Sequence, residues 1–172
     1  MRQPECHEGR ANRRKAGADE MIRVTAGGVR KGDRILIARR GGDDPLAGKW
    51  EFPGGKVEDN EDPESGLKRE LREELGIRVR VTRFIAEYPF SYPEKDILLL
   101  FFEAEYLGGH IALHAHEEFA WVSAAELTRY DFAPADVEFA RSLSAAQPLS
   151  SDPLRPAIQK VGRPRRPCVA GE

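Results

Sequence analysis

The sequence predicts an α/β fold on three observations. Segments with the alternation of β-strands recur between residues 22 and 122. Helix patterns lie between and after these segments, and such interleaving is typical of α/β proteins, in which helices pack on a sheet. The length of 172 residues suffices for a single domain with a buried core. We expect this domain to cover residues 21–147.

The first predicted strands are short apolar segments bounded by turn residues. Residues 22–26 alternate apolar and polar side chains. Residues 33–39 form a second apolar segment, which follows a turn at residues 31–33. A loop over residues 41–48 then leads to a short segment, residues 50–52. We therefore expect at least two paired strands before the first helix.

The first helix is predicted from its two ends and its apolar face. Asp62 is a good N-cap residue, and Pro63 suits the first helical turn, where its missing N–H costs nothing. Gly76 suits the left-handed position that ends a helix. At about 100° per residue, one face of the helix is apolar and consists of Leu67, Leu71 and Leu75.

The segments after this helix predict further strands and two more helices. Strands are expected over residues 78–86, 96–106 and 119–122. Two prolines in residues 88–94 predict a loop, and Gly108 with Gly109 predicts a turn. A capping-box pattern from Ser123 to Glu126 predicts a short helix, and Pro134 begins a last helix that ends near residue 146.

Both ends of the chain lack apolar periodicity. Residues 1–20 are polar, and residues 148–172 are rich in proline and arginine, so we expect both segments to be disordered. Met21 begins the first strand pattern and is a candidate native start. The basic C-terminal segment could contact RNA or acidic partners, but we expect it to be a solvated tail.

Composition excludes several functional classes. The net charge of −2 gives no electrostatic footprint for stable nucleic-acid binding. No apolar stretch is long enough to span a bilayer, and the first residues lack the pattern of a signal peptide. Cys6 and Cys168 are the two cysteines and predict neither a disulfide framework nor a zinc site. We expect a cytoplasmic protein.

Three glutamates on the first helix predict a site for a metal ion and phosphate. Glu70, Glu73 and Glu74 are three and four residues apart, so their charges repel, and the helix dipole disfavours them. A solvated acidic face is the alternative. Magnesium takes oxygen ligands from carboxylates and phosphates. The glycines and Lys56 that precede the helix favour the metal site. His114 and His116 are poor candidate ligands, since hard magnesium prefers oxygen.

Residues 55–77 match Gly-x5-Glu-x7-Arg-Glu-U-x-Glu-Glu-x-Gly-U, with U apolar, at every specified position. This pattern resembles the signature of the Nudix hydrolases. Residues 50–56, Arg39 with Arg40, and residues 130–136 resemble the MutT type of that family. The resemblance covers roughly residues 22–143. It implies an α/β/α sandwich with a mixed sheet, and a magnesium-dependent reaction that converts nucleoside triphosphates to monophosphates and pyrophosphate.

The resemblance also implies roles for individual residues. Magnesium, for which manganese could substitute, would be held by the Gly54 carbonyl, Glu70, Glu73 and Glu74. Arg69 and Glu61 would hold these carboxylates in place. Phosphates would face Arg40 and Lys56, and the nucleoside would contact Glu51, Phe52 and Pro53. Without the signature, Arg40 would be a surface ion pair, Lys56 a solvated side chain and Phe52 a core residue.

The general base departs from the family pattern. Many MutT-like chains carry a glutamate six residues before the tryptophan that is Trp121 here, and that position is Ala115. Either Glu117 or Glu118 fills the role, with Glu118 preferred, or a carboxylate of the signature does.

The preferred nucleobase depends on Asp136, which is an acceptor as a carboxylate. It would suit the N4 amine of cytosine or the N1–H and N2 edge of guanine, and a guanine O6 only if protonated. The alternative is an acid favoured by the helix dipole after Pro134. The leading substrates are 8-oxo-(d)GTP and (modified) CTP or dCTP, in a nucleotide-pool sanitising role. The alternatives are another diphosphate such as ADP-ribose, or a non-catalytic nucleotide-binding module. The oligomeric state stays open.

Overall fold

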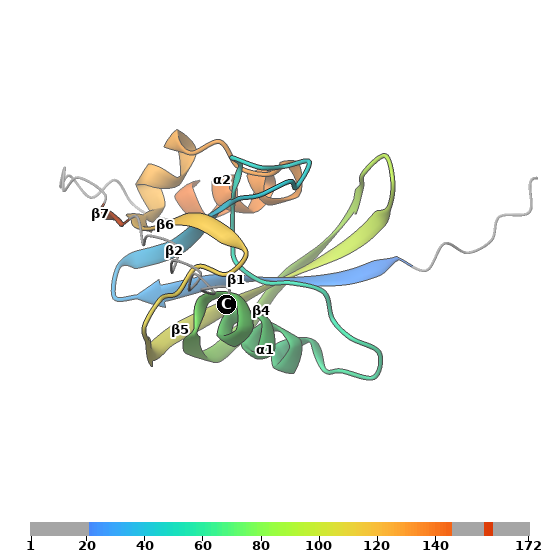
Figure 1. Ribbon diagram of the computed structural model, residues 1–172, viewed down its shortest axis with the longest axis horizontal. Coiled ribbons are helices and arrows are strands. Elements are labelled where there is room, and N and C mark those ends of the chain that lie inside the picture. Colours follow the sequence, from blue (N-terminus) through green and yellow to red (C-terminus); the bar gives the residue numbers. More distant parts are fainter. Residues whose placement is uncertain (1–20, 146–156, 160–172) are drawn as a thin grey trace, which may run out of the picture.

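The computed structural model describes residues 21–145 and 157–159, and the α/β prediction is confirmed. A mixed sheet of seven strands has the order β4-β5-β1-β2-β6-β7, with β3 paired to β2 (Figure 1). The strands are β1 (Ile22–Lys31), β2 (Arg34–Arg40), β3 (Trp50–Glu51), β4 (Ile77–Ser91), β5 (Asp96–Gly109), β6 (His116–Ser123) and β7 (Ala157–Gln159). The pair β1–β5 is parallel, and the other named strand pairs are antiparallel.

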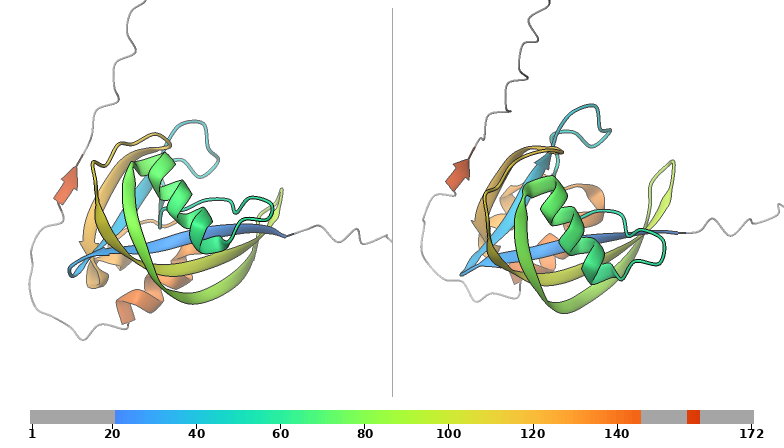
Figure 2. Two further views of the ribbon diagram at one scale, coloured as in Figure 1. Left: turned by 90° about the horizontal axis from the view of Figure 1, so that it is seen from below. Right: turned by 60° about the horizontal axis from the view of Figure 1, so that its bottom comes forward.

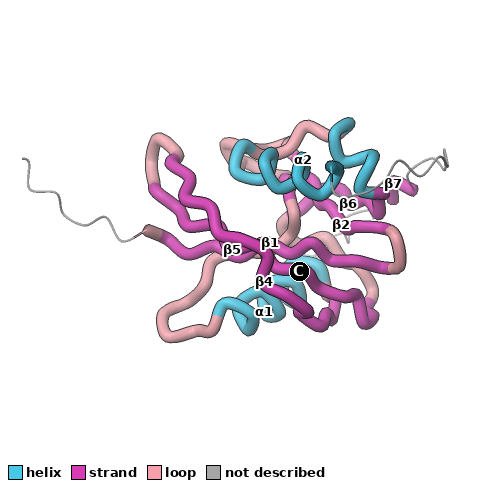
Figure 3. Tube along the Cα trace, turned by 180° about the vertical axis from the view of Figure 1, so that it is seen from behind, coloured by secondary structure: helices cyan, strands magenta, loops and turns pink. Residues whose placement is uncertain are grey.

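The helices lie on opposite faces of the sheet. Helix α1 (Pro63–Leu75) crosses one face, whereas α2 (Val137–Ala145) covers the other (Figure 2). Two 3₁₀ helices, η1 (Ala124–Arg129) and η2 (Pro134–Asp136), lead from β6 into α2. The view from behind shows the same three layers (Figure 3). The expected α/β/α sandwich is therefore the observed architecture.

Each face of the sheet has its own apolar core. The predicted stripe of α1, Leu67, Leu71 and Leu75, is fully buried against sheet residues that include Leu36 and Phe102. The opposite core places Phe139 of α2 in stacked contact with Phe101, at 3.9 Å between ring centroids. Because a buried leucine or phenylalanine contributes about 1.5–3 kcal/mol, these two contacts fix both helices on the sheet.

The ends of α1 follow the predicted local chemistry. The Asp62 carboxylate accepts a hydrogen bond from the Ser65 N–H at 3.1 Å, and Pro63 is the first helical residue. Gly76 has a φ of 68° and donates its N–H to the Arg72 carbonyl at 3.0 Å. A Cβ at Gly76 would lie 2.9 Å from the His110 carbonyl oxygen. Glycine therefore both ends the helix and admits the neighbouring loop.

Several strands are longer than the sequence predicts, and β4 and β5 continue through a predicted loop and a predicted turn. The predicted loop at residues 88–94 is wrong for residues 88–91, because β4 continues to Ser91. Strand β4 lies at an edge of the sheet, where Pro89 is tolerated since its missing N–H is not needed there. The predicted turn at Gly108 is also wrong, because β5 continues to Gly109, which pairs with Ile77.

Strand β6 begins at His116, three residues earlier than predicted. The two glutamates that follow His116 therefore belong to a strand, and a β-bulge interrupts their pairing with β2 beside Arg39 and Arg40. In a strand, successive side chains point to opposite faces. The start of β6 thus decides which of these side chains can reach the site.

Strand β7 lies within the segment expected to be disordered. Its three residues pair antiparallel with β6 through Phe119↔Gln159, Ala120↔Ile158 and Trp121↔Ala157. So short a strand has no periodicity that a sequence pattern could reveal. The expected disorder of residues 1–20, 148–156 and 160–172 concerns positions outside the described residues. Among the described helices, none has the length and hydropathy to cross a membrane.

Candidate functional site

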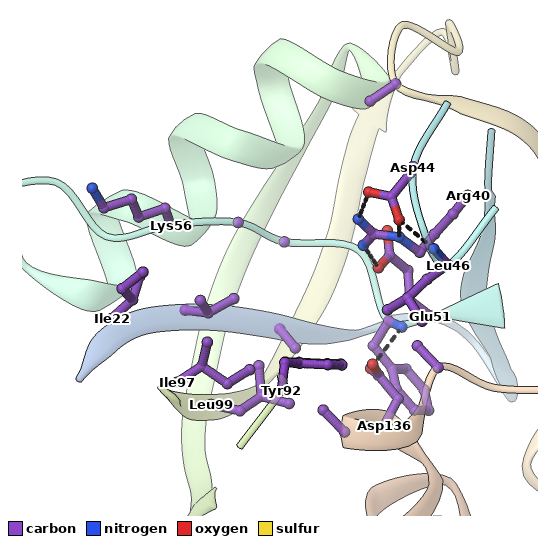
Figure 4. A pocket seen from close by; sticks show the side chains of 18 of the residues that line it. Ile22, Arg40, Asp44, Leu46, Glu51, Lys56, Tyr92, Ile97, Leu99 and Asp136 are labelled. Carbon is purple, nitrogen blue, oxygen red and sulfur yellow. Dashed lines mark hydrogen bonds and ion pairs between the residues drawn. The ribbon is translucent and has the colours of Figure 1, made fainter. Parts of the chain in front are cut away.

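A pocket of about 650 Å³ opens between the end of α1, strand β1, the start of β6 and η2. Seven predicted site residues line it: Arg40, Glu51, Phe52, Gly54, Lys56, Glu74 and Asp136. Figure 4 shows Lys56 at one end and the Arg40 guanidinium at the other, with Asp136 beyond Glu51. The predicted residues Arg69, Glu70, Glu73, Pro53 and Glu118 do not line it. The pocket thus joins one signature acid to the predicted nucleoside contacts.

The glycine segment before α1 forms one wall. The carbonyls of Pro53 and Gly55 accept hydrogen bonds from Gly27 and Thr25 of β1 at 2.9 and 2.8 Å. The Gly54 carbonyl lies between them and takes part in none of the described hydrogen bonds to β1. A Cβ at Gly54 would lie 2.1 Å from the Thr25 carbonyl oxygen, so this position admits only glycine.

Gly55 also requires the absence of a side chain, because α1 packs directly against it. A Cβ there would lie 2.4 Å from the Glu70 carboxyl carbon. The two glycines therefore bring the segment close to β1 on one side and to α1 on the other. This close approach places a backbone carbonyl beside the acidic face of the helix.

Arg69 connects the signature acids in the predicted manner. Its guanidinium donates to both oxygens of Glu61, each at 2.9 Å, and to Glu70 at 2.8 Å. It also donates to the Lys56 carbonyl at 3.0 Å. These hydrogen bonds lower the pKa of Glu61 to about 2 and raise the pKa of Arg69. Glu61 and Glu70 are thus compensated by a cation within the protein.

Glu74 differs from the other two signature acids. The Glu73 side chain is 61% exposed, and Glu70 is bound to Arg69. Glu74 is largely buried, and burial raises the pKa of its carboxyl to about 7. The charges of Glu51 and Glu70 raise this pKa further, whereas His116 and Arg40 oppose the shift. Glu74 has no hydrogen bond or ion pair with the described side chains, so its charge is left uncompensated at the pocket wall.

The described residues do not bring three histidine, cysteine, aspartate or glutamate side chains together into a complete metal cluster. The donors that do lie at this wall are the Glu74 carboxylate and the Gly54 carbonyl. Both are oxygen donors of the kind that magnesium prefers, and magnesium commonly keeps waters and phosphate oxygens as its other ligands. The wall therefore fits a magnesium ion that is shared with a phosphate.

Arg40 is bound differently from the prediction. It was expected to face phosphates, but its guanidinium donates to Asp44 and to Glu51. Burial opposes the charge, yet these hydrogen bonds outweigh it and raise the pKa of Arg40. The prediction was that Arg40 faces phosphates, whereas two carboxylates bind its guanidinium here. Asp44 lies in the predicted loop, and no sequence pattern predicts this contact.

Asp136 is buried beyond Glu51, on the same side of the pocket as Arg40 (Figure 4). Its Oδ1 accepts a hydrogen bond from the Phe52 N–H at 3.1 Å. Complete burial, assisted by the charge of Glu51, raises the pKa of Asp136 to about 8. The Phe52 ring is 2% exposed and stacks on Phe132 at 5.2 Å between centroids. Phe52 is therefore a core residue as well as a pocket residue.

Glu118 does not reach the pocket. Its side chain is 7% exposed and is paired with Arg39 at 2.9 Å. The neighbouring Glu117 pairs with the same guanidinium at 2.9 Å. The prediction that Glu118 is the base does not fit this position, because both candidate glutamates are bound to Arg39 and neither lines the pocket.

The structure adds two pocket residues that sequence reasoning missed. Tyr92 lies at the tip of the β4–β5 hairpin and lines the pocket, and burial raises the pKa of its hydroxyl. His116, which the sequence presented only as a poor metal ligand, lies 2.6 Å from Glu51 through its Nε2. No local sequence pattern predicts the contact between His116 and Glu51, since 65 residues separate them.

Comparisons with known proteins identify the family and the relatives of this chain. The NUDIX domain model matches residues 21–143. The CTP pyrophosphohydrolase of Escherichia coli is 37% identical over 132 residues, which are 75% of this chain and 98% of that protein. A putative 8-oxo-dGTP diphosphatase 2 of Mycobacterium tuberculosis is 37% identical over 134 residues, 72% of this chain and 91% of that protein. The solution structure of the E. coli ORF135 protein has a TM-score of 0.67 at 36% identity, and it covers 78% of this chain and 98% of that one.

Proposed function

Because the chain belongs to the Nudix hydrolases, we propose that it is a magnesium-dependent pyrophosphohydrolase of nucleoside triphosphates. Its products would be a nucleoside monophosphate and pyrophosphate, and its role would be to clear unwanted or oxidised nucleotides from the cytoplasmic pool. One observation carries the proposal: a single pocket joins the uncompensated Glu74 to Glu51, Phe52 and Asp136. A triphosphate and a base could therefore be held at the same time.

Glu74 and the Gly54 carbonyl would hold the magnesium ion, with Glu70 and Glu73 beside them on α1. Manganese would be an acceptable substitute because it also prefers oxygen ligands. When bound, the metal neutralises phosphate charge and lowers the pKa of its water. Arg69 fixes the Glu70 carboxylate at 2.8 Å. Lys56 lines the phosphate end of the pocket and supplies a cation that no described ion pair occupies.

The proton of the attacking water needs a carboxylate within reach. Glu117 and Glu118 are held by Arg39 outside the pocket. We therefore assign proton transfer to a carboxylate of α1. Glu74 is the first candidate, since it lines the pocket whereas Glu70 and Glu73 do not. Glutamine variants at the three positions would separate this assignment from a role for Glu118.

The nucleobase would lie against Asp136 and Phe52. A pKa of about 8 keeps Asp136 mainly protonated at neutral pH, so its hydroxyl can donate a hydrogen bond. Below pH 8, Asp136 therefore donates as well as accepts. A protonated Asp136 suits the O6 of an oxidised guanine, and it also suits the N3 of cytosine. Both 8-oxo-(d)GTP and (modified) CTP or dCTP stay candidate substrates, which agrees with the names of the two relatives above.

The proposal is tested by initial rates of pyrophosphate release with and without magnesium. The panel is dGTP, 8-oxo-dGTP, CTP, dCTP and 5-methyl-dCTP, with Glu74→Gln as the control. ADP-ribose is added with release of AMP as its readout, because its hydrolysis gives AMP and ribose 5-phosphate and no pyrophosphate. Magnesium-dependent release from either leading class supports the proposal and selects the base. Turnover of ADP-ribose alone would replace it with a different Nudix reaction. Nucleotide binding without turnover would indicate a non-catalytic module.

A further inference from the structure

His116 has no assigned role in the mechanism, yet it lies at the pocket. It is the first residue of β6, its side chain is 2% exposed, and it lines the pocket wall. Its Nε2 lies 2.6 Å from Oε1 of Glu51. Its Nδ1 is buried and has no hydrogen-bond partner among the described residues. The ring is therefore held at one nitrogen, and that nitrogen acts on a residue of the nucleoside site.

Glu51 depends on two partners for its orientation. Oε1 meets His116, and Oε2 accepts a hydrogen bond from Arg40. Arg40 in turn donates to Asp44 at 3.2 Å through Nε. His116, Glu51, Arg40 and Asp44 thus form one continuous chain of polar contacts along the wall. The chain begins at β6, passes through β3 and β2, and ends in the loop that follows β2.

His116 is the anchored end of this chain. A histidine side chain has two rotatable bonds, and this one starts from a residue paired with Arg40 in the sheet. Both the neutral Nε2–H tautomer and the imidazolium donate through Nε2. Without that donor, Oε1 of a side chain that is 13% exposed would lose its partner, and buried carboxylate oxygens without partners are costly. Glu51 would then turn toward Arg40 or toward solvent.

We infer that His116 is a positioning residue of the nucleotide site, which fixes the Glu51 carboxylate and, through it, the Arg40 guanidinium. This inference rests on the proposed function, because it assigns nucleotide binding to the pocket. His116 is not a metal ligand here, since its Nε2 is engaged by Glu51 and its Nδ1 is buried. It acts on substrate affinity and base selectivity, because Glu51 lies between the metal wall and Asp136.

The test compares two substitutions that place an amide nitrogen at different ring positions. His116→Gln puts its nitrogen at the same number of bonds from Cβ as Nε2, whereas His116→Asn puts its nitrogen where Nδ1 lies. His116→Asn should raise KM about ten- to hundredfold, the range for a hydrogen bond to a charged group, with a smaller change in kcat. His116→Gln should recover most of that loss. Equal losses in both variants would overturn the inference.

A double-substitution cycle excludes a role in packing alone. In a Glu51→Gln background, His116→Asn should change KM by less than about twofold, because the partner charge is gone. If the double variant raises KM by the product of the two single effects, His116 acts independently of Glu51, and the inference is overturned. Thermal unfolding of each variant identifies any that fail to fold. If the His116 variants fail to fold, the ¹⁵N spectrum of the His116 imidazole in the unaltered protein and in Glu51→Gln replaces the kinetics. The Nε2 resonance should shift on Glu51→Gln, and no shift would count against the contact.

The two proposals can fail separately. If the unaltered protein hydrolyses none of the panel, the proposed reaction is wrong, and Trp50 fluorescence then measures nucleotide affinity instead. The inference would stand if the unaltered protein binds nucleotide tightly, His116→Asn binds it more weakly, and His116→Gln binds it nearly as tightly as the unaltered protein. A protein that hydrolyses nucleotides with the same KM in all variants would keep the reaction and overturn the inference. Absence of any nucleotide binding would overturn both.

Discussion

The α1 wall of the pocket and its nucleoside contacts hold their acidic side chains in opposite ways. At the α1 wall, Glu74 is buried with no cation from the described residues bound to it, and its pKa is raised to about 7. Among the nucleoside contacts, Glu51 is paired with both Arg40 and His116. Asp136 is compensated by a proton, since its pKa is about 8. The protein therefore leaves one negative charge for an external cation and satisfies the others itself.

This difference separates the phosphate chemistry from base recognition. A carboxylate that lacks an internal partner gains most from a divalent ion, because the ion removes a burial cost. Carboxylates that are already paired or protonated have fixed positions and can select a ligand by geometry. Substitutions at the α1 wall should therefore abolish turnover, whereas substitutions among the nucleoside contacts should alter which nucleotide is used.

The largest effect is expected for Glu74→Gln. Loss of the charged oxygen should lower pyrophosphate release about 10³-fold or more, the scale expected when an electrostatic contribution to the transition state is removed. Glu73→Gln is the matched comparison on the same helix, and its effect should be smaller because that side chain is 61% exposed. Steady-state kinetics decides the order, and a larger loss in Glu73→Gln would contradict the contrast.

Asp136→Asn should change selectivity more than turnover. The amide cannot lose its proton, so the ratio of kcat/KM between 8-oxo-dGTP and cytosine nucleotides should shift about 10–100-fold, the scale of one or two buried hydrogen bonds. In the unaltered protein the same ratio should change as pH rises through about 8, where Asp136 loses its proton. A ratio that stays constant with pH and with substitution would remove Asp136 from base recognition.

Magnesium affinity should depend on pH through Glu74. The carboxyl must lose its proton before it binds the metal, so affinity should rise about tenfold per pH unit below pH 7 and level off above pH 7, where Glu74 is already ionised. Isothermal titration with magnesium between pH 5.5 and 8.5 measures this profile. A profile that is flat across pH 7 would show that the metal does not bind at Glu74.

The smallest effect concerns the stability of the metal-free protein. The pKa of Glu74 is raised from 4.5 to about 7 on folding, so folding favours the protonated acid. This stabilisation is complete below pH 4.5 and is lost as pH rises through 7. At pH 8, the free energy of unfolding of Glu74→Gln should therefore exceed that of the unaltered protein by about 1–3 kcal/mol. Urea denaturation measures this difference. At pH 4, Glu74→Gln and the unaltered protein should be equally stable. The stability difference between Glu73→Gln and the unaltered protein should not depend on pH in this way.

The parts of the fold that the sequence predicts are those set by local chemistry. Asp62, Pro63 and Gly76 fix the ends of α1 through contacts within a few residues, so the helix was predicted to within one residue. The extents of β4 and β5 depend on the partner strand. Pro89 is acceptable because β4 is an edge strand, a fact that only the assembled sheet provides.

The candidate site also contains contacts that the sequence predicts and contacts that only the folded structure reveals. The contacts of Arg69 with Glu61 and Glu70 arise within one loop–helix unit and were predicted. The pairing of Arg40 with Asp44 was not predicted, because it depends on the conformation of the loop after β2. The binding of Glu118 by Arg39 was not predicted either, because it depends on the register between β2 and β6. A strand that starts three residues earlier, with a bulge, changes which side chain faces the pocket, and that side chain is His116. The sequence of one strand alone does not contain this information about its pairing with a neighbouring strand.

Magnesium binding to three proteins tests the central contrast most directly. Calorimetric titration at pH 8 should give measurable binding for the unaltered protein and for Asp136→Asn, and none for Glu74→Gln. That result would place the metal at the wall of the pocket where the charge is uncompensated. Binding that survives in Glu74→Gln and is lost in Asp136→Asn would contradict the account, since the metal would then lie among the nucleoside contacts.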